Sequence, residues 1–211
     1  MAEERTAPPG QREVATAPAP QVAAEYADPG PLGLAAFALT TFVLSFFNAG
    51  ILDARGEPIV LGLALAYGGI SQFAAGLFEV RKGNTFGATA FCSYGAFWVS
   101  FWVFVTFLAD SVPASVAGSA VGLYLIAWGI FTFYMWIASF RTTAAISLVF
   151  LLLWITFVVL GIGEAAGSET ISKIGGYVGI ATALAAWYAS FAGVLNSTFG
   201  RTTLPVKPLT R

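Results

Sequence analysis

The sequence predicts an all-α membrane protein, a bundle of six transmembrane helices, and three observations support this fold class. Hydrophobic residues make up 57% of the 211 residues, charged residues make up only 10%, and the mean hydropathy is +0.78. Soluble domains carry about 25% charged residues. The 10 basic and 11 acidic residues are also unevenly spaced, and they leave six long intervals without any charge.

These six uncharged intervals are the predicted transmembrane segments. In chain order they cover residues 29–52, 58–78, 83–109, 111–140, 142–163 and 174–200. A helix needs roughly 20 apolar residues to cross a bilayer, so each interval suffices for one crossing and none for two. A membrane β-barrel would need alternating hydrophobicity, which stretches such as 147–160 lack. Helices also keep every backbone hydrogen bond internal, as lipid requires.

The ends of the chain differ in composition from the predicted transmembrane domain, residues 29–200. Residues 1–28 are rich in Ala, Pro, Glu and Gln and contain few large apolar side chains, so we expect a disordered cytoplasmic tail. Its opening charges, Glu3, Glu4 and Arg5, do not fit a secretory signal. Residues 201–211 are predicted to form a short cytoplasmic C-terminal tail.

The basic residues of the connecting segments predict the orientation. If the N-terminus is cytoplasmic, the two outer basic residues are Arg55 and Lys173. The six inner ones are Arg81, Lys82, Arg141, Arg201, Lys207 and Arg211. This distribution follows the positive-inside rule. We therefore expect a multi-pass protein of the cytoplasmic (inner) membrane with both termini in the cytoplasm.

The composition argues against most enzyme chemistry. The chain has no histidine and a single cysteine, Cys92, which excludes His-based metal sites, Ser-His-Asp triads, intrachain disulfides and multi-Cys metal sites. A net charge of −1 leaves no basic surface for nucleic acid. Because no catalytic pair lies within a predicted span, we expect neither an enzyme nor a bound cofactor or metal.

The first predicted helix carries polar residues on one face. Its face residues, spaced by four, three and four positions, are Phe37, Thr41, Leu44 and Asn48, and Thr40 and Ser45 flank them. Such a face should point into the bundle and line an aqueous path. Interhelical hydrogen bonding explains Thr40 and Thr41 equally well. Asn48, near the predicted outer mouth, could simply cap the helix.

The second predicted helix and the residues after it supply four additional pathway candidates: Tyr67, Gln72, Glu79 and Asn84. Gln72 and Glu79 are seven positions apart and share a face. For Glu79 we weigh a role in proton handling against an interfacial salt bridge with the basic residues that follow, and we favour the salt bridge. No other carboxylate lies within a span, so an intramembrane relay of Asp, Glu and His is absent.

Several glycine pairs are spaced four positions apart, as in small-xxx-small motifs, which let helices approach closely. These pairs are Gly83 and Gly87, Gly118 and Gly122, and Gly175 and Gly179. Close helix packing explains them without any substrate, and the same surfaces could support oligomerisation.

Five stretches resemble a known family. Residues 28–34, Asp-Pro-Gly-Pro-Leu-Gly-Leu, are similar to the Asn-Pro-Ala-Pro-Leu-Gly-Leu signature of the acetate/succinate uptake transporters of the YaaH/SatP type. The similarity continues through residues 67–79, 81–98, 124–132 and 195–205. It departs at Asp28 and Gly30, which replace the Asn and Ala of the signature, and at residues 192–193, where a Glu is often found.

The resemblance implies a six-helix protein that assembles as a homohexamer. Each protomer would have its own pathway for acetate and related small monocarboxylates and, as in some members, for succinate. By position, Phe37, Tyr94 and Leu153 match the residues of the family's constriction. Whether transport is channel-like or proton-coupled stays open.

A carboxylate pathway must compensate for the hydration that a bare anion loses. It can supply hydrogen-bond donors, as Thr40, Thr41 and Asn48 would, or it can conduct the neutral acid. With a pKa of ~4.3, about one acid molecule in several hundred is protonated at pH 7. Because the spans hold no charged relay, we expect a coupled proton to travel on the substrate. The alternatives are a channel for small neutral solutes such as urea or amides and, third, an intramembrane enzyme or structural subunit.

Overall fold

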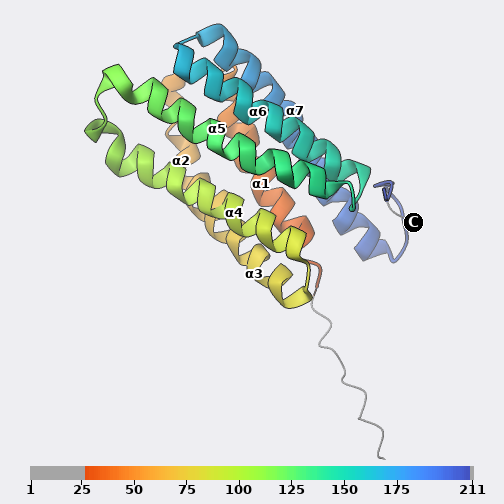
Figure 1. Ribbon diagram of the computed structural model, residues 1–211. Coiled ribbons are helices and arrows are strands. Elements are labelled where there is room, and N and C mark those ends of the chain that lie inside the picture. Colours follow the sequence, from red (N-terminus) through yellow and green to blue (C-terminus); the bar gives the residue numbers. More distant parts are fainter. Residues whose placement is uncertain (1–26, 210–211) are drawn as a thin grey trace, which may run out of the picture.

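The computed structural model describes residues 27–209, and this part of the chain is helical almost throughout (Figure 1). The seven α-helices of residues 27–209 are α1 (Gly30–Asn48), α2 (Ile59–Leu65), α3 (Gln72–Lys82), α4 (Thr85–Val103), α5 (Ala114–Ser139), α6 (Ala144–Ala166) and α7 (Glu169–Phe199). Two π-helical segments are η2 (Ala66–Ser71) and η3 (Phe104–Leu108), and two 3-10 turns are η1 (Ala54–Gly56) and η4 (Ala109–Ser111). No named strand occurs within these residues.

Within residues 27–209, neighbouring helical segments join into six continuous helices that are candidate membrane spans, as the sequence predicts. α2, η2 and α3 together form Ile59–Lys82, and α4 continues through its short turns to give Thr85–Ser111. The other four spans are α1, α5, α6 and α7, and all six are long and apolar enough to cross a bilayer. The fold class is thereby confirmed.

The last helix begins earlier than its uncharged interval suggests, at Glu169 instead of residue 174. Ser168 caps it, because its Oγ accepts a hydrogen bond from the backbone N–H of Ile171. Lys173 Nζ pairs with Glu169 Oε1, one helical turn away, at 2.6 Å. A search for uncharged intervals cannot include such charged residues, although they are tolerated at the end of a span where water is within reach.

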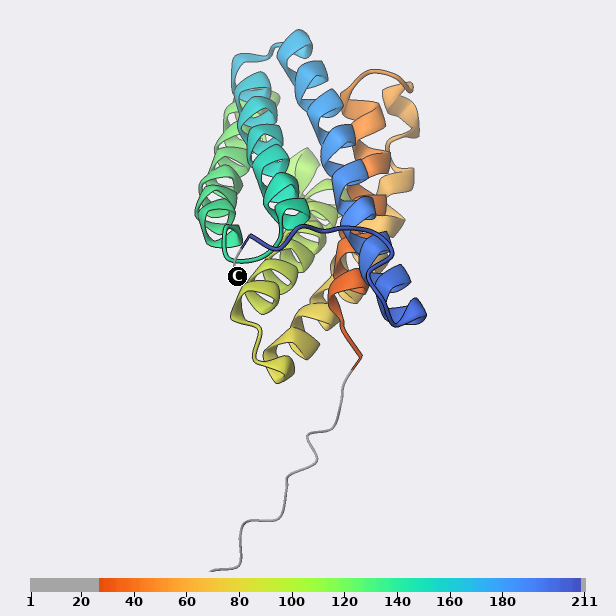
Figure 2. The ribbon, with the colours of Figure 1, turned by 90° about the vertical axis from the view of Figure 1, so that its right-hand side faces the viewer.

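Most helices pack against their neighbours in the chain, and the last helix, α7, packs against the first, α1 (Figures 1 and 2). The extensive interfaces join α5 to α6, α6 to α7, α7 to α1, and α3 to α4, while α1 also contacts η2 and α3. α1 begins and α7 ends at the same end of the bundle, as six crossings require (Figure 2). We refer to this as the near end, and to the opposite one, where α1 ends and α7 begins, as the far end.

Two of the three glycine pairs lie at close helix contacts. A Cβ at Gly118 or Gly122 of α5 would lie 2.7–2.8 Å from backbone oxygens of α6, and one at Gly175 of α7 would lie 2.6 Å from the Leu160 side chain. Gly179 lies directly against Ser45 of α1. The small-xxx-small prediction is confirmed for these pairs and wrong for the pair that begins at Gly83.

Gly83 has open space around it and a φ of +76°. It is the left-handed residue that ends α3, a conformation that favours glycine because it has no Cβ. Its spacing from Gly87 reflects a helix end followed by a new helix, and not a shared packing face.

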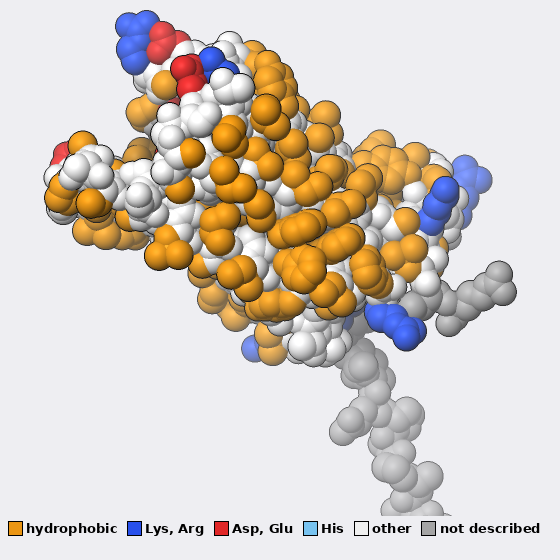
Figure 3. Space-filling view, turned by 45° about the horizontal axis from the view of Figure 1, so that its top comes forward, with side chains coloured by type: hydrophobic (Ala, Val, Ile, Leu, Met, Phe, Trp, Pro, Cys, Tyr) orange, Lys and Arg blue, Asp and Glu red, His pale blue; other side chains and the backbone are white. Residues whose placement is uncertain are grey.

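The surface of the bundle is mostly hydrophobic, and charged side chains gather at its two ends (Figure 3). α5 shows this most clearly, since Leu123 is 71% exposed and Ile130 is 65% exposed. Such a surface is stable next to lipid hydrocarbon, which cannot hydrogen-bond to polar groups.

The described part of the C-terminal segment, residues 201–209, returns across the near end of the bundle. Asn196 Oδ1 accepts hydrogen bonds from the backbone N–H groups of Thr203 and Leu204, and the Tyr188 hydroxyl donates to the Pro205 carbonyl at 2.6 Å. The backbone N–H of Ala144 donates to the Lys207 carbonyl at 2.8 Å. The segment therefore ties α7 to the start of α6. The predicted disordered tail, 1–28, lies outside the described residues except for its last two.

Candidate functional site

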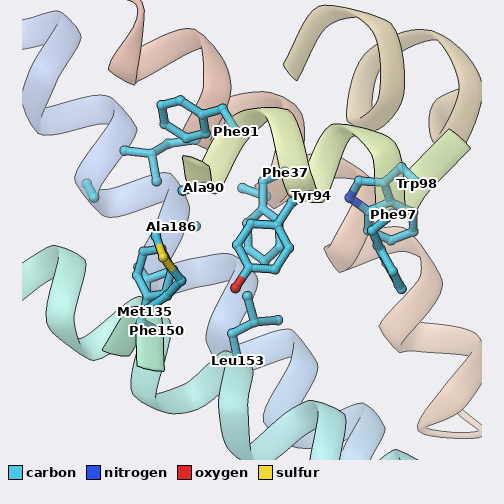
Figure 4. Packing of buried hydrophobic residues seen from close by; sticks show 14 of the residues in the cluster. Phe37, Ala90, Phe91, Tyr94, Phe97, Trp98, Met135, Phe150, Leu153 and Ala186 are labelled. Atoms are coloured by element: carbon cyan, nitrogen blue, oxygen red, sulfur yellow. The ribbon is translucent and has the colours of Figure 1, made fainter. Parts of the chain in front are cut away.

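Three apolar and aromatic side chains from three helices meet near the middle of the bundle. Phe37 comes from α1, Tyr94 from α4 and Leu153 from α6, and Figure 4 shows Leu153 pointing toward the Tyr94 hydroxyl. The Phe37 and Tyr94 rings are 6.0 Å apart between centroids. All three belong to one packed core and expose only 5, 3 and 4% of their surface. The structure thus brings together the three residues that the family resemblance implies for a constriction.

Tyr94 is the most highly connected member of this group. Its ring packs against Phe131, Phe150 and Phe157 at centroid distances of 5.3, 6.1 and 6.5 Å. Its hydroxyl shares a 2.9 Å hydrogen bond with Thr132 Oγ1 of α5. The aromatic contacts and this hydrogen bond fix the ring in one orientation, so Tyr94 has a defined position in the candidate constriction.

The two threonines of α1 have different hydrogen-bonding states. Thr40 Oγ1 donates to the Ala36 carbonyl of its own helix at 2.9 Å, and its side chain lies against Gly68 beside Trp98. Thr41 Oγ1 is buried and has no hydrogen-bond partner. The packing interpretation therefore suffices for Thr40, whereas Thr41 keeps a free hydroxyl one turn from Phe37.

Two further buried polar atoms lack partners, Gln72 Oε1 and Trp98 Nε1. The second span runs antiparallel to α1, because Glu79 lies near Gly30 and Gly68 lies near Thr40. Gln72 lies between Gly68 and Glu79 and is therefore at the level of Phe37. Trp98 is one turn beyond Tyr94 on α4. Leaving a buried polar group unpaired costs about 1–3 kcal/mol. A polar ligand or water that satisfied these atoms would recover that free energy.

Trp98 is a candidate site residue that reasoning from the sequence did not include. Its position in the sequence suggests only a belt or packing role, because tryptophan is common in both. What distinguishes it is the combination of 2% exposure and an unpaired indole N–H. No pattern in the sequence carries that information.

A second polar group lies between the constriction and the far end. Thr156 Oγ1 of α6 and Thr182 Oγ1 of α7 are 3.1 Å apart, and each also bonds to a carbonyl of its own helix. Ser45 of α1 lies against Gly179, which is close to Thr156. These side chains hydrogen-bond or pack between helices, and they extend the polar face of α1 toward the far end.

Two of the remaining candidates, Asn48 at the far end and Tyr67 on the second span, are less buried. Asn48, the last residue of α1, is half-buried and lines a hollow of about 420 Å³. The Asn48 side chain does not cap α1. The backbone N–H of Ala49, the C-cap residue, donates to carbonyls of the helix instead. Tyr67 lies in η2 and is half-buried, next to the fully buried Gly68.

Glu79 and Asn84 form a buried pair near the opposite end. Asn84 Nδ2 donates to Glu79 Oε2 at 2.8 Å, and Asn84 Oδ1 accepts from the Gly87 N–H, which caps α4. Glu79 is only 2% exposed. It fits there because Gly87, which it contacts, has no side chain.

The favoured interpretation of Glu79, an interfacial salt bridge with the following basic residues, is therefore wrong. Lys82 Nζ pairs with Asp28 Oδ1 at 2.7 Å instead, and the same oxygen accepts from the N–H of Gly30 at the start of α1. Asp28 competes successfully because it is exposed at the end of the bundle, whereas Glu79 points inward. The Asp28–Lys82 pair spans 54 positions, so spacing along the chain could not reveal it.

Neither the constriction nor its polar flanks offers a metal site. Within residues 27–209, no three His, Cys, Asp or Glu side chains gather closely enough to hold an ion. The arrangement is a packed apolar and aromatic contact with uncharged hydrogen-bonding groups near it. Such a geometry can select a small, partly polar solute by size and hydrogen bonding.

Comparisons with known proteins agree with this architecture. Acetate permease A of Emericella nidulans is 41% identical over 199 residues, covering 87% of this chain and 67% of its own. The succinate-acetate/proton symporter SatP of Escherichia coli K12 is 38% identical over 180 residues, covering 85% and 95%. The solved structure of the bacterial acetate channel SatP superposes with a TM-score of 0.81 at 37% identity, covering 86% of this chain and 99% of that one.

Some relatives are longer than this chain. Accumulation of dyads protein 2 of Saccharomyces cerevisiae is 44% identical over 182 residues, but these make up only 64% of its length. The sequence model of the GPR1/FUN34/yaaH family matches residues 10–211. The chain therefore belongs to the GPR1/FUN34/yaaH family and is a multi-pass membrane protein.

Proposed function

We propose that this protein conducts acetate and related small monocarboxylates across the cytoplasmic membrane, with succinate as a further candidate substrate. The observation that carries the proposal is the buried constriction of Phe37, Tyr94 and Leu153, flanked by unpaired polar atoms. The names of the relatives, an acetate permease, a succinate-acetate/proton symporter and an acetate channel, support the same substrate class.

The unpaired atoms suit a protonated acid better than its anion. Gln72 Oε1 is an acceptor, which a carboxylic O–H can satisfy, while Thr41 and Trp98 can donate to the acid's carbonyl oxygen. An anion would meet an acceptor at Gln72 and would lose its hydration in an apolar gap. In this proposal the neutral acid passes the constriction and the coupled proton travels on it.

The pH dependence of transport tests this mechanism. The neutral fraction of acetate rises nearly tenfold for each pH unit between 7 and 6. At fixed total acetate, the initial rate of labelled acetate uptake into proteoliposomes should therefore rise about five- to tenfold over that interval. Protein-free liposomes provide the baseline, because neutral acetic acid also permeates lipid. A flat rate above that baseline would contradict the mechanism.

The same measurement decides the role of Glu79. The Glu79 carboxyl accepts a hydrogen bond from Asn84 and packs against Gly87. In the proposed mechanism it does not carry protons. The Glu79→Gln variant should keep the pH slope of the unmodified protein within about twofold. A slope that disappears in this variant would assign proton handling to Glu79 and refute transport of the proton on the substrate.

A channel for small neutral solutes is the second candidate, because the same uncharged groups can hydrogen-bond an amide. Competition discriminates between the two functions. Excess unlabelled propionate should suppress labelled acetate uptake, and excess urea should leave it unchanged. Suppression by urea alone would favour the neutral-solute channel.

The assembly and orientation are part of the proposal. The apolar exterior of α5 suits either lipid or neighbouring copies, and we propose a homohexamer in which each protomer has its own pathway. Both termini would face the cytoplasm, in keeping with the basic residues Arg141, Arg201 and Lys207 at the near end. Mass measurement in detergent tests the hexamer, and protease access to the N-terminus in intact cells tests the orientation.

A further inference from the structure

A hollow opens at the far end of the bundle, outside the constriction and its polar flanks. It measures about 420 Å³ and lies between the end of α1, the following loop and the start of α7. Its polar lining residues are Asn48, Asp53, Glu169, Ser172 and Lys173. Acidic and basic side chains lie side by side at this end of the molecule (Figure 3).

The fold holds Lys173 in a defined position in this hollow. The lysine stem lies across Gly50, where a Cβ would be 2.6 Å from Lys173 Cε. Gly50 also has a φ of +67°, so the turn after α1 both requires glycine and leaves room for the lysine. The ammonium group is thereby placed beside the turn that follows α1, and the C-terminal end of a helix favours a cation.

The charges around Lys173 are not equally available. Arg55 and Asp53 satisfy each other through three side-chain hydrogen bonds of 2.6–3.1 Å. Lys173 is half-exposed and pairs with Glu169, whose side chain is 82% exposed. Exposed pairs of this kind are weak. Another carboxylate that entered the hollow could therefore replace Glu169.

We propose that Lys173, with Asn48 and Ser172, forms a capture site for the carboxylate of a small organic acid, and that Glu169 occupies it as an intramolecular substitute. This inference rests on the proposed function, because the captured acid is the one conducted. The three residues offer an ammonium, an amide and a hydroxyl, all of which can donate to carboxylate oxygens. A donor set of this kind binds the anion, which is the predominant form at neutral pH.

The capture site leads toward the constriction. Asn48 shares a face of α1 with Thr41 and follows Ser45 by one turn, and Ser45 lies beside the Thr156–Thr182 pair. Ser172 of α7 lies against Gly163 of α6. An acid held at Lys173 is thus at the start of a series of polar groups that ends at the apolar gap, where it must be neutral to continue.

Charge variants test the capture site through the kinetics of acetate uptake at low ionic strength. Lys173→Met keeps the stem over Gly50 and removes the charge, so the apparent KM should rise about two- to fivefold with the maximal rate unchanged. Lys173→Arg keeps the positive charge and should therefore have the same KM as the unmodified protein. Glu169→Gln should lower the KM about twofold, because it frees the ammonium.

Two controls separate capture from a general effect of surface charge. Asp53→Asn/Arg55→Gln removes the neighbouring ion pair from the same end and should leave the KM unchanged, since these two charges already neutralise each other. The double variant Glu169→Gln/Lys173→Met should behave like Lys173→Met alone, because the substitution at Glu169 acts only through the lysine. In about 1 M salt, where the Debye length is about 3 Å, the differences should vanish.

The uptake is measured in right-side-out and in inverted membrane vesicles, and the effect should occur only where the far end faces the medium. An unchanged KM in both Lys173→Met and Glu169→Gln, or equal effects of Lys173→Met and Asp53→Asn/Arg55→Gln, would overturn the capture site while leaving transport intact. Unmodified protein that conducts no acetate above protein-free vesicles would overturn the proposed function and the capture site together.

Discussion

Replacement of Leu153 by alanine should broaden the range of acids that the protein conducts. Leu153 is 4% exposed and faces Tyr94, so it forms part of the packed apolar contact on the proposed pathway (Figure 4). A hydrophobic site discriminates by about 10-fold or more for each methylene that it must accommodate. We therefore expect the uptake rate of butyrate relative to acetate to rise at least tenfold in Leu153→Ala.

The neighbouring leucine Leu148 supplies a matched control. It lies on the same helix but is 49% exposed, so Leu148→Ala should leave the ratio of butyrate to acetate unchanged. Leu153→Met, which nearly conserves volume, should also stay close to the original ratio. Because a buried Leu→Ala substitution costs about 2–5 kcal/mol in soluble proteins, each variant must first elute as the unmodified protein does. An unchanged ratio in a folded Leu153→Ala variant would exclude Leu153 from the selectivity of the pathway.

The six spans could be predicted from the sequence because the bilayer imposes a simple rule. A charged side chain in hydrocarbon is costly, so charges mark the ends of the spans almost directly. The rule fails where water is within reach, and for that reason it placed the start of α7 at residue 174 although the helix begins at Glu169. It could not show that residues 201–209 return to bind α6 and α7, because the returning segment makes those contacts with its own backbone groups.

The constriction was accessible from the sequence for a different reason. The periodicity of α1 places Phe37 and Thr41 on one inward face, while Tyr94 and Leu153 entered through the family resemblance. The pairing of Asp28 with Lys82 and the unpaired indole of Trp98 were not accessible. Each depends on which atoms meet across helices, and no spacing within one helix contains that information.

The packing of α7 on α1 at Gly176 leads to the prediction with the largest effect on stability. A Cβ at Gly176 would meet the backbone N of Ala49 and lie 2.6 Å from the carbonyl carbon of Asn48. These are backbone atoms, which cannot rotate away, so the two helices must separate. Overpacking costs about 1–3 kcal/mol even against side chains. Gly176→Ala should therefore lower the Tm of the purified protein by about 5 °C or more.

Gly62 provides the opposite case in the same protein. It lies in α2 with nothing within 4 Å of its Cβ position, so Gly62→Ala should leave the Tm unchanged or raise it slightly, as expected when alanine replaces glycine in a helix. A Tm of Gly176→Ala within 1–2 °C of that of Gly62→Ala would show that α1 and α7 can move apart freely. The positions of Asn48 and Lys173 relative to each other would then not be fixed, and the capture site would lose the rigid framework that Gly176 gives it.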